Sequence, residues 1–164
     1  KKDQILCAKI RKGHFEGVLD VMNRLTKIIN PDKIFMGEKD FQQLYLVKNF
    51  LKKKYKTKII SCRTIRGKNK IALSSRNFLL NSSSLNLAGK IYKKLKNIKK
   101  KINKKKDISD YLMYSKKKLE MSLKIKIDYL ELRNINNLKI SKTKNNSRLF
   151  IAYYLNNVRL IDNL

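Results

Sequence analysis

The sequence is poor in the residues that build metal centres, disulfides and membrane spans. It has one histidine and two cysteines among 164 residues, which excludes a histidine cluster and leaves no disulfide framework. Cys7 and Cys62 have neither CxxC spacing nor a neighbouring histidine, so we expect both to be reduced, packed thiols. No stretch approaches eighteen apolar residues and no signal peptide is visible, so we expect a cytoplasmic protein without a membrane-spanning segment.

Acidic residues are also scarce. The sequence has 12 Asp and Glu against 41 Lys and Arg, which gives a formal net charge of +29. Such a charge attracts nucleic acid electrostatically. However, 33 of the cations are Lys and eight are Arg, and a genome rich in A/T codons would produce this balance. The lysines are spread widely, whereas base reading favours Arg, Asn and Gln on one face. A basic nucleic-acid-binding module therefore stays an alternative, but we expect no specific binding to nucleic acid.

Short helices and strands alternate in the first part of the chain. Apolar residues at helical spacing predict a helix over 16–29, which Pro31 ends. The apolar run 33–37 predicts a strand, residues 38–55 a second helix, and 57–62 another strand. Such an alternation is typical of a parallel α/β sheet.

The pattern changes in the second part of the chain. The serines at 82–84 are N-cap candidates for a helix whose apolar stripe ends at Ile102, and 107–123 predict another helix. Residues 126–134 and 148–163 predict strands, the latter folded back at a pair of asparagines that tolerate positive φ. Helices followed by antiparallel strands indicate a small α+β domain.

Polar and charged residues follow both predicted strands of the first part. Ligands bind beyond the carboxyl ends of strands in open α/β sheets, and the stretches GEKDFQQ and RTIRGKNKIALSSRN come directly after the two strands. A helix start with a lysine attracts anions, and hydroxyls with an arginine can hold a polyphosphate. The candidates are Gly37, Lys39, Asp40 and Gln43 in the first stretch and Ser74, Ser75 and Arg76 in the second.

Each candidate also has a plain structural explanation. Lys39 and Asp40 would equally suit a solvated helix start, and Gln42 and Gln43 would suit a helix surface. A lone histidine is more often structural, although the place of His14 just before a helix keeps it a candidate for a ligand contact. Spacing alone therefore predicts a site for an anionic or nucleotide substrate and goes no further.

Four stretches taken together resemble a known family. KGHFEGV, MGEKDFQQL, ALSSRN and VRLIDN occur in the order and approximate spacing of the C-terminal half of pantothenate synthetases, the pantoate–β-alanine ligases. The resemblance covers essentially the whole chain. It implies an α/β fold in which residues 1–64 are the C-terminal part of a Rossmann-like parallel-sheet nucleotidyltransferase domain. Residues 65–164 would then be a small α+β lid domain.

The resemblance implies an adenylate-forming enzyme. It would activate pantoate with ATP, accompanied by Mg²⁺, and then join the pantoyl adenylate to β-alanine, releasing AMP; the family's enzymes are typically cytoplasmic homodimers. The implied catalytic residues are Lys39, Ser74, Ser75 and Arg76. The same residues would bind ATP together with Gly37, Asp40, Thr64 and Ile65. The implied pantoate-side residues are Gln43, His14 and Arg11, and no residue is assigned to a metal.

The chain also departs from the family pattern. Lys12 stands where the family usually has Pro, and Asn69-Lys70 stands where it usually has Asp-Gly, so the loss of that glycine is expected to stiffen or re-aim the loop. The HIGH-like motif, the first pantoate glutamine and the magnesium-side acidic residues belong to the family's N-terminal half and are absent here. The first residue is Lys1 rather than Met. We therefore expect the chain alone to be poorly stable and nearly inactive, and an inactive remnant is the second alternative.

Overall fold

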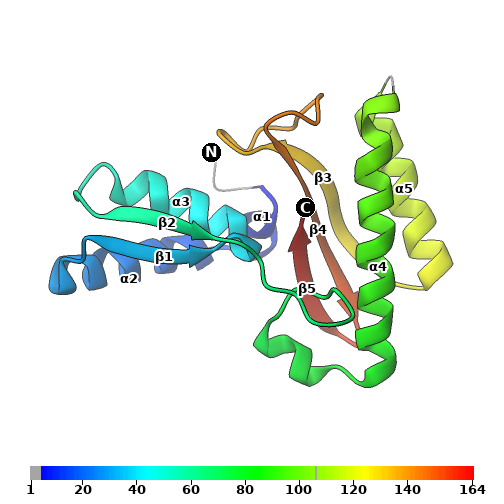
Figure 1. Cartoon of the computed structure of the whole chain (residues 1–164), viewed down its shortest axis with the longest axis horizontal. Coiled ribbons are helices and arrows are strands. Elements are labelled where there is room, and N and C mark those ends of the chain that lie inside the picture. Colours follow the sequence, from blue (N-terminus) through cyan, green and yellow to red (C-terminus); the bar gives the residue numbers. More distant parts are fainter. Residues whose placement is uncertain (1–4, 106) are drawn as a thin grey trace. The chain divides into compact units, whose positions relative to one another are not determined.

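The chain divides into two units, residues 1–64 and 65–164, and each is described by itself. The computed structural model describes residues 5–105 and 107–164. Figure 1 shows helices beside a small parallel sheet in the first unit and a larger antiparallel sheet in the second. None of the helices in the described ranges has the length and apolar character needed to cross a bilayer.

The first unit is built on two parallel strands. Its elements are α1 (Cys7–Ile10), α2 (His14–Ile29), β1 (Lys33–Gly37), the 3₁₀ turn η1 (Glu38–Asp40), α3 (Phe41–Leu51) and β2 (Lys58–Cys62). β1 and β2 pair in parallel, as the sequence predicts. The second predicted helix begins as η1 and continues as α3, which buries one stripe of apolar side chains, Leu44, Val47 and Leu51.

Part of the apolar surface of the first unit is exposed. α2 forms where the apolar spacing predicts it and packs against α3, yet Leu25 is exposed and Ile28 is 78% exposed. On β1, Phe35 is 67% exposed, and β2 is its one hydrogen-bonded neighbour among the described strands. An apolar helix face, an exposed aromatic ring and an unpaired strand edge are the features that an incomplete α/β sheet presents.

The second unit packs two helices on an antiparallel sheet with the strand order β3-β4-β5. Figure 1 shows α4 and α5 side by side along the sheet. The elements are the 3₁₀ helix η2 (Ser75–Leu79), α4 (Ser82–Lys101), the 3₁₀ turn η3 (Ile102–Lys104), α5 (Ile108–Leu123), β3 (Ile127–Asn134), β4 (Ser147–Leu155) and β5 (Val158–Asn163). One continuous core lies between α4, α5 and the sheet, so this unit buries a hydrophobic face of its own.

Most of the predicted local structure of the second unit is confirmed, with one detail wrong there and another wrong in the first unit. Asn156 and Asn157 form the hairpin turn with φ of 47° and 64°, as the sequence predicts. The N-cap of α4 is Asn81 rather than one of the serines, because its side-chain oxygen accepts from the Ser84 amide at 2.9 Å. In the first unit, Cys62 is exposed at the end of β2 rather than packed.

The loop before Ser74 lies very close to α4. A Cβ at Gly89 would lie 2.4 Å from the carbonyl oxygen of Asn69, so only glycine allows this approach. The Asn69 side chain also donates to the Leu85 carbonyl at 3.1 Å. Lys70, where the family usually has glycine, keeps a left-handed backbone with φ of 70°. A residue other than glycine adopts this left-handed conformation at a cost of about 1 kcal/mol.

Candidate functional site

Parallel pairing brings the ends of β1 and β2 together. Gly37 and Cys62 are register partners at the last position of the pairing. The segments that follow the two strands therefore start from adjacent positions at one edge of the sheet. This confirms that the two predicted strands are neighbours, and such an edge is where open α/β sheets bind their ligands.

Lys39 lies at this edge, in the 3₁₀ turn directly after β1. Its side chain is 20% exposed, and its Nζ lies 3.7 Å from an oxygen of the half-exposed Asp40 carboxylate. Among the described residues, nothing apart from its chain neighbours lies within 4 Å of the place where a Cβ would stand on Gly37, so a ligand can approach that backbone closely. A partly buried ammonium, a carboxylate and open backbone suit an anionic ligand with hydroxyl groups. In the described ranges, no three His, Cys, Asp or Glu side chains gather as potential metal ligands.

The adjacent glutamines of α3 have different environments. Gln42 is buried, its Oε1 accepts from the Cys7 amide at 3.0 Å, and its Nε2 donates to the Ile5 carbonyl at 2.8 Å. The prediction that Gln42 is a surface residue is therefore wrong, and it is a positioning residue that the sequence analysis missed. Gln43 is half-buried, one turn after Asp40. Side chains at adjacent positions of a helix point in different directions. Gln42 therefore binds the backbone of residues 5–7, and Gln43 does not share that role.

Arg11 and His14 lie on either side of the turn that begins α2. Gly13 is the N-cap of α2 with a left-handed φ of 74°, and the Arg11 carbonyl accepts from the His14 amide at 3.3 Å. Arg11 is exposed, whereas His14 is half-buried with its ring centroid 5.0 Å from that of Phe15. Because Gln42 ties residues 5–7 to α3, the segment that carries Arg11 and His14 starts beside the first turn of that helix.

Thr64 and Ile65 continue from β2. Thr64 is half-buried at the end of the first unit, and Ile65 is exposed at the start of the second. Both follow the strand whose carboxyl end lies beside Gly37. Their contact with adenine through the backbone stays a prediction.

Ser74, Ser75 and Arg76 lie together at the start of η2 in the second unit. The Ser74 hydroxyl accepts from the Arg76 amide at 3.3 Å and caps the 3₁₀ helix, whereas Ser75 is exposed. Arg76 is half-buried, and its Nη1 donates to the carbonyl oxygen of Arg159 on β5 at 2.8 Å. The structure therefore brings the three predicted phosphate ligands together and ties their arginine to the last strand.

An ion pair between Arg66 and Asp162 was missed by the sequence analysis. The Arg66 guanidinium donates two bonds to the Asp162 carboxylate, at 2.7 and 2.8 Å, and lies 4.2 Å from the centroid of the Tyr92 ring. Burial opposes the charged form of Arg66, but the hydrogen bond and the charge of Asp162 outweigh it and raise its pKa. The carboxylate within the apolar stretch VRLIDN is the signal that would have indicated a buried partner.

One strand thus holds the loop over residues 66–76 at both ends. Asp162 on β5 binds Arg66 at the beginning of the loop, and the Arg159 carbonyl on β5 binds Arg76 at its end. The stretch VRLIDN forms β5 itself (Val158–Asn163). The four stretches that carry the family resemblance therefore include the predicted phosphate loop and the strand that supports it.

Comparison of the sequence with known proteins gives a consistent result over its whole length. The sequence profile of the family described as Pantoate-beta-alanine ligase matches residues 1–164. The chain is 37% identical to the pantothenate synthetase of Flavobacterium psychrophilum over 160 residues, which are 95% of this chain and 56% of that protein. It is 39% identical to the pantothenate synthetase of Buchnera aphidicola subsp. Acyrthosiphon pisum over 166 residues, 99% of this chain and 58% of that protein.

Solved structures show the same likeness. The pantothenate synthetase of Thermus thermophilus matches with a TM-score of 0.89 and 27% identity, covering 99% of this chain and 60% of that one. The pantoate-beta-alanine ligase of Francisella tularensis, complexed with beta-gamma ATP and beta-alanine, matches with a TM-score of 0.75 and 36% identity over 99% of this chain and 54% of that one. The predicted α/β fold is confirmed at this level, and the chain spans little more than half the length of these relatives.

Proposed function

The chain belongs to the pantoate–β-alanine ligase family, and from that premise we propose that it supplies the C-terminal part of an enzyme that condenses pantoate with β-alanine using ATP. The observation that carries the proposal is the position of Lys39. It lies directly after β1, beside the end of β2, where an open α/β sheet binds its ligand. In the proposed first step a pantoate carboxylate oxygen attacks the α-phosphorus of ATP, and the bond to pyrophosphate breaks.

The first unit would act as a Rossmann-like nucleotide-binding domain. The Lys39 ammonium stabilises the negative charge that develops on the phosphates during the attack. The open backbone at Gly37 and the carboxylate of Asp40 suit the ribose, and the backbone at Thr64 and Ile65 meets the adenine. Gln43 holds pantoate through hydrogen bonds, because its amide can donate and accept.

The second unit would hold the phosphates and close over the reaction as a lid. Ser75 is exposed and Ser74 lies beside it, so both hydroxyls can turn to the β- and γ-phosphates. A guanidinium carries five N–H donors, so Arg76 can keep its bond to the Arg159 carbonyl and still bind the departing pyrophosphate. A closed lid excludes water, which would otherwise hydrolyse the mixed anhydride of pantoate and AMP.

In the second step the amine of β-alanine attacks the carbonyl carbon of pantoyl adenylate. An amide bond forms, the bond to AMP breaks, and the amine loses a proton. We assign His14 and Arg11, at the start of α2, to the pantoate and β-alanine side. The Francisella relative was solved with beta-gamma ATP and beta-alanine, which supports these two ligand classes for the family. Mg²⁺ would enter with ATP and neutralise phosphate charge.

The exposed apolar surface of the first unit supports an enzyme in which a further polypeptide segment covers that surface. Ile28 and Phe35 are largely exposed, and β1 has an unpaired edge among the described strands. We assign this surface to contact with a segment equivalent to the remaining N-terminal part of the relatives. With that segment present, a cytoplasmic homodimer like those of the family is the expected assembly. Without it, little activity is expected.

The test is AMP release from ATP, pantoate and β-alanine with magnesium. The chain is assayed alone and together with the segment encoded upstream of it, and samples without pantoate serve as controls. We expect pantoate-dependent AMP release in the combined sample and very little from the chain alone. No release from either sample, with both folded by circular dichroism, would overturn the proposal and favour an inactive remnant. Steep salt-dependent binding to RNA or DNA in such samples would favour the basic nucleic-acid module.

Substitutions of the two adjacent glutamines should change different quantities, the KM for pantoate in the case of Gln43 and the stability in the case of Gln42. Replacing Gln43 with alanine is expected to raise the KM for pantoate about tenfold with unchanged stability, because one hydrogen-bonding group is lost. Replacing Gln42 with alanine is expected to lower the free energy of unfolding of the first unit by about 1–3 kcal/mol, because two buried backbone groups lose their partner. Urea denaturation and steady-state kinetics measure both quantities, and the opposite assignment of effects would contradict these roles.

A further inference from the structure

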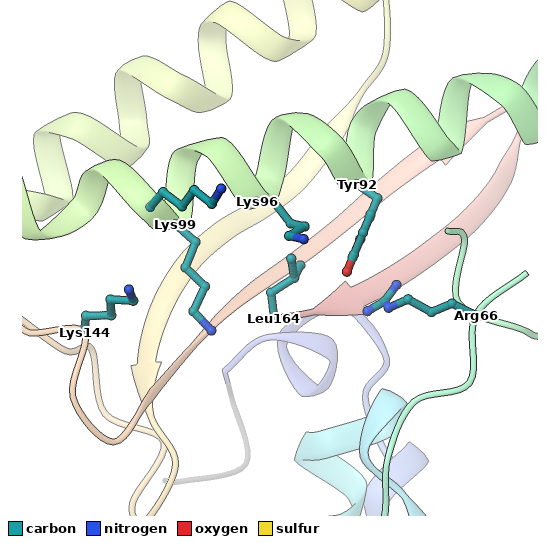
Figure 2. Close-up of a pocket in the computed structure, with 7 residues that line it drawn as sticks. Arg66, Tyr92, Lys96, Lys99, Lys144 and Leu164 are labelled. Carbon is teal, nitrogen blue, oxygen red and sulfur yellow. The ribbon is translucent and has the colours of Figure 1, made fainter. Parts of the chain in front are cut away.

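The second unit contains a basic cavity apart from Ser74, Ser75 and Arg76. It has a volume of about 380 Å³, and Figure 2 shows its walls on α4, on the segment before β4 and at the end of β5. A cavity of this size can hold a small organic molecule. The lining residues are Arg66, Tyr92, Lys96, Lys99, Lys100, Lys144 and Leu164, here called the basic pocket.

The positive charge of the basic pocket is mostly uncompensated. Arg66 is balanced by Asp162, with which it makes the ion pair described above. Within the described residues, no carboxylate pairs with any of the four lysines, Lys96, Lys99, Lys100 and Lys144. Four ammonium groups that share one cavity repel each other, and a bound anion would remove that repulsion.

The environment of Lys99 disfavours its charged form, mainly through burial. Its side chain is half-buried in the pocket wall, whereas Lys96 and Lys100 of the same pocket are exposed. Burial, together with the nearby charges of Arg148 and Lys144, lowers the pKa of Lys99. An anion placed between Lys99 and Lys144 would stabilise the charged form that burial disfavours.

The high lysine content of the chain does not by itself explain why these side chains line one cavity. Lys96, Lys99 and Lys100 are spaced by three and four residues and share one face of α4, whereas Lys94 and Lys101 lie on the opposite face. Lys144 comes from a different segment, between β3 and β4. In Figure 2, Lys96, Lys99 and Lys144 extend toward the space beside Leu164.

We propose that the basic pocket binds a compact polyanion that carries at least two phosphate groups, at a place separate from Ser74, Ser75 and Arg76, although Arg66 at the start of the same loop lines the pocket. Ammonium groups are strong charged donors to phosphate oxygens, and several of them around one cavity suit more than one phosphate. The Tyr92 ring and the Leu164 side chain supply apolar wall for an organic group attached to the phosphates.

The test is calorimetric titration of the chain with inorganic tripolyphosphate at constant ionic strength. The titration is made in the Ser75→Ala/Arg76→Ala background, because tripolyphosphate resembles the ATP phosphates that we assign to that loop. We expect one molecule bound per chain in this background and about tenfold weaker binding when Lys99→Gln/Lys144→Gln is added. The matched control is Lys94→Gln/Lys101→Gln, which removes the same charge from the opposite face of α4 and should change binding less than twofold. Equal weakening by both variants, or binding of many molecules, would show a diffuse electrostatic effect and overturn the proposal.

Two further measurements locate the bound polyanion. The variant Ser75→Ala/Arg76→Ala should still bind one tripolyphosphate per chain, and complete loss of binding would place the ligand on the phosphate loop instead and overturn the proposal. In the unmodified chain, amide NMR signals of Tyr92 and Lys144 should shift on titration, while those of residues far from the basic pocket stay constant. This second readout does not depend on any variant being folded.

Discussion

Replacing Arg76 with alanine is expected to lower the rate of pantoate-dependent AMP formation by about 10²–10³-fold. Losses of this size follow the removal of one donor aimed at developing negative charge. Arg76 lies at the start of η2 and donates to the Arg159 carbonyl at 2.8 Å, which restrains its guanidinium. Under the proposed function, its other donors would bind the departing pyrophosphate. The quantity to measure is kcat/KM for ATP in the assembly that contains the upstream segment.

The control for this prediction is another cation of the same loop. Lys68 is exposed and belongs to the turn before Ser74, so Lys68→Ala should change the rate less than twofold. Arg76→Lys keeps the charge but loses the fork of donors, and it should recover only part of the activity. If Lys68→Ala and Arg76→Ala slowed the reaction equally, the loop would act through its general charge, and the role given to Arg76 would be wrong.

Replacing Asp162 with alanine is expected to destabilise the second unit by about 3–5 kcal/mol. The substitution leaves the Arg66 guanidinium charged, largely buried and without its bidentate partner, and breaking one side of a buried ion pair has this typical cost. The measurement is urea denaturation of the chain, followed by far-ultraviolet circular dichroism.

Two comparisons test the cause of that loss. The double variant Arg66→Ala/Asp162→Ala should be less destabilised than Asp162→Ala alone, because no unpaired charge remains. The pair of Asp20 and Arg24 on α2 is exposed, so Asp20→Ala should cost under about 1 kcal/mol. An Asp162→Ala variant no less stable than Asp20→Ala would show that the bond between loop and strand contributes little.

Local patterns predicted most of the elements of this fold. The stripe that ends at Ile102 identified α4 because helical periodicity is read within a few turns. The apolar run over 149–155 and the Asn-Asn pair after it identified β4, β5 and their turn. The N-cap was misplaced because Asn81 and the serines after it are all good caps. Only the backbone geometry decides which of them is used.

Long-range pairing explains what the sequence did not predict about the candidate site. Lys39 could be placed because a strand and its end are local features, and parallel pairing then set it beside the end of β2. The buried position of Gln42 leaves no trace in the local sequence, and the carboxylate within VRLIDN indicates a buried partner for Asp162 without identifying Arg66 as that partner. The basic pocket could not be predicted from the sequence either, because Lys99 and Lys144 come to line the same cavity only when α4 packs on the sheet.

The support of the loop over residues 66–76 by β5 has a consequence for the order of events during translation. Arg66 and Asp162 are separated by 96 positions, and Arg76 and Arg159 by 83. Ribosomes add residues from the N-terminus, so the loop emerges long before the strand that holds it has been made. A nascent chain therefore carries the loop without its supports. Proteolytic removal of β5 from the folded protein would likewise leave the loop without its bonds to β5, although Ser74, Ser75 and Arg76 would still be present.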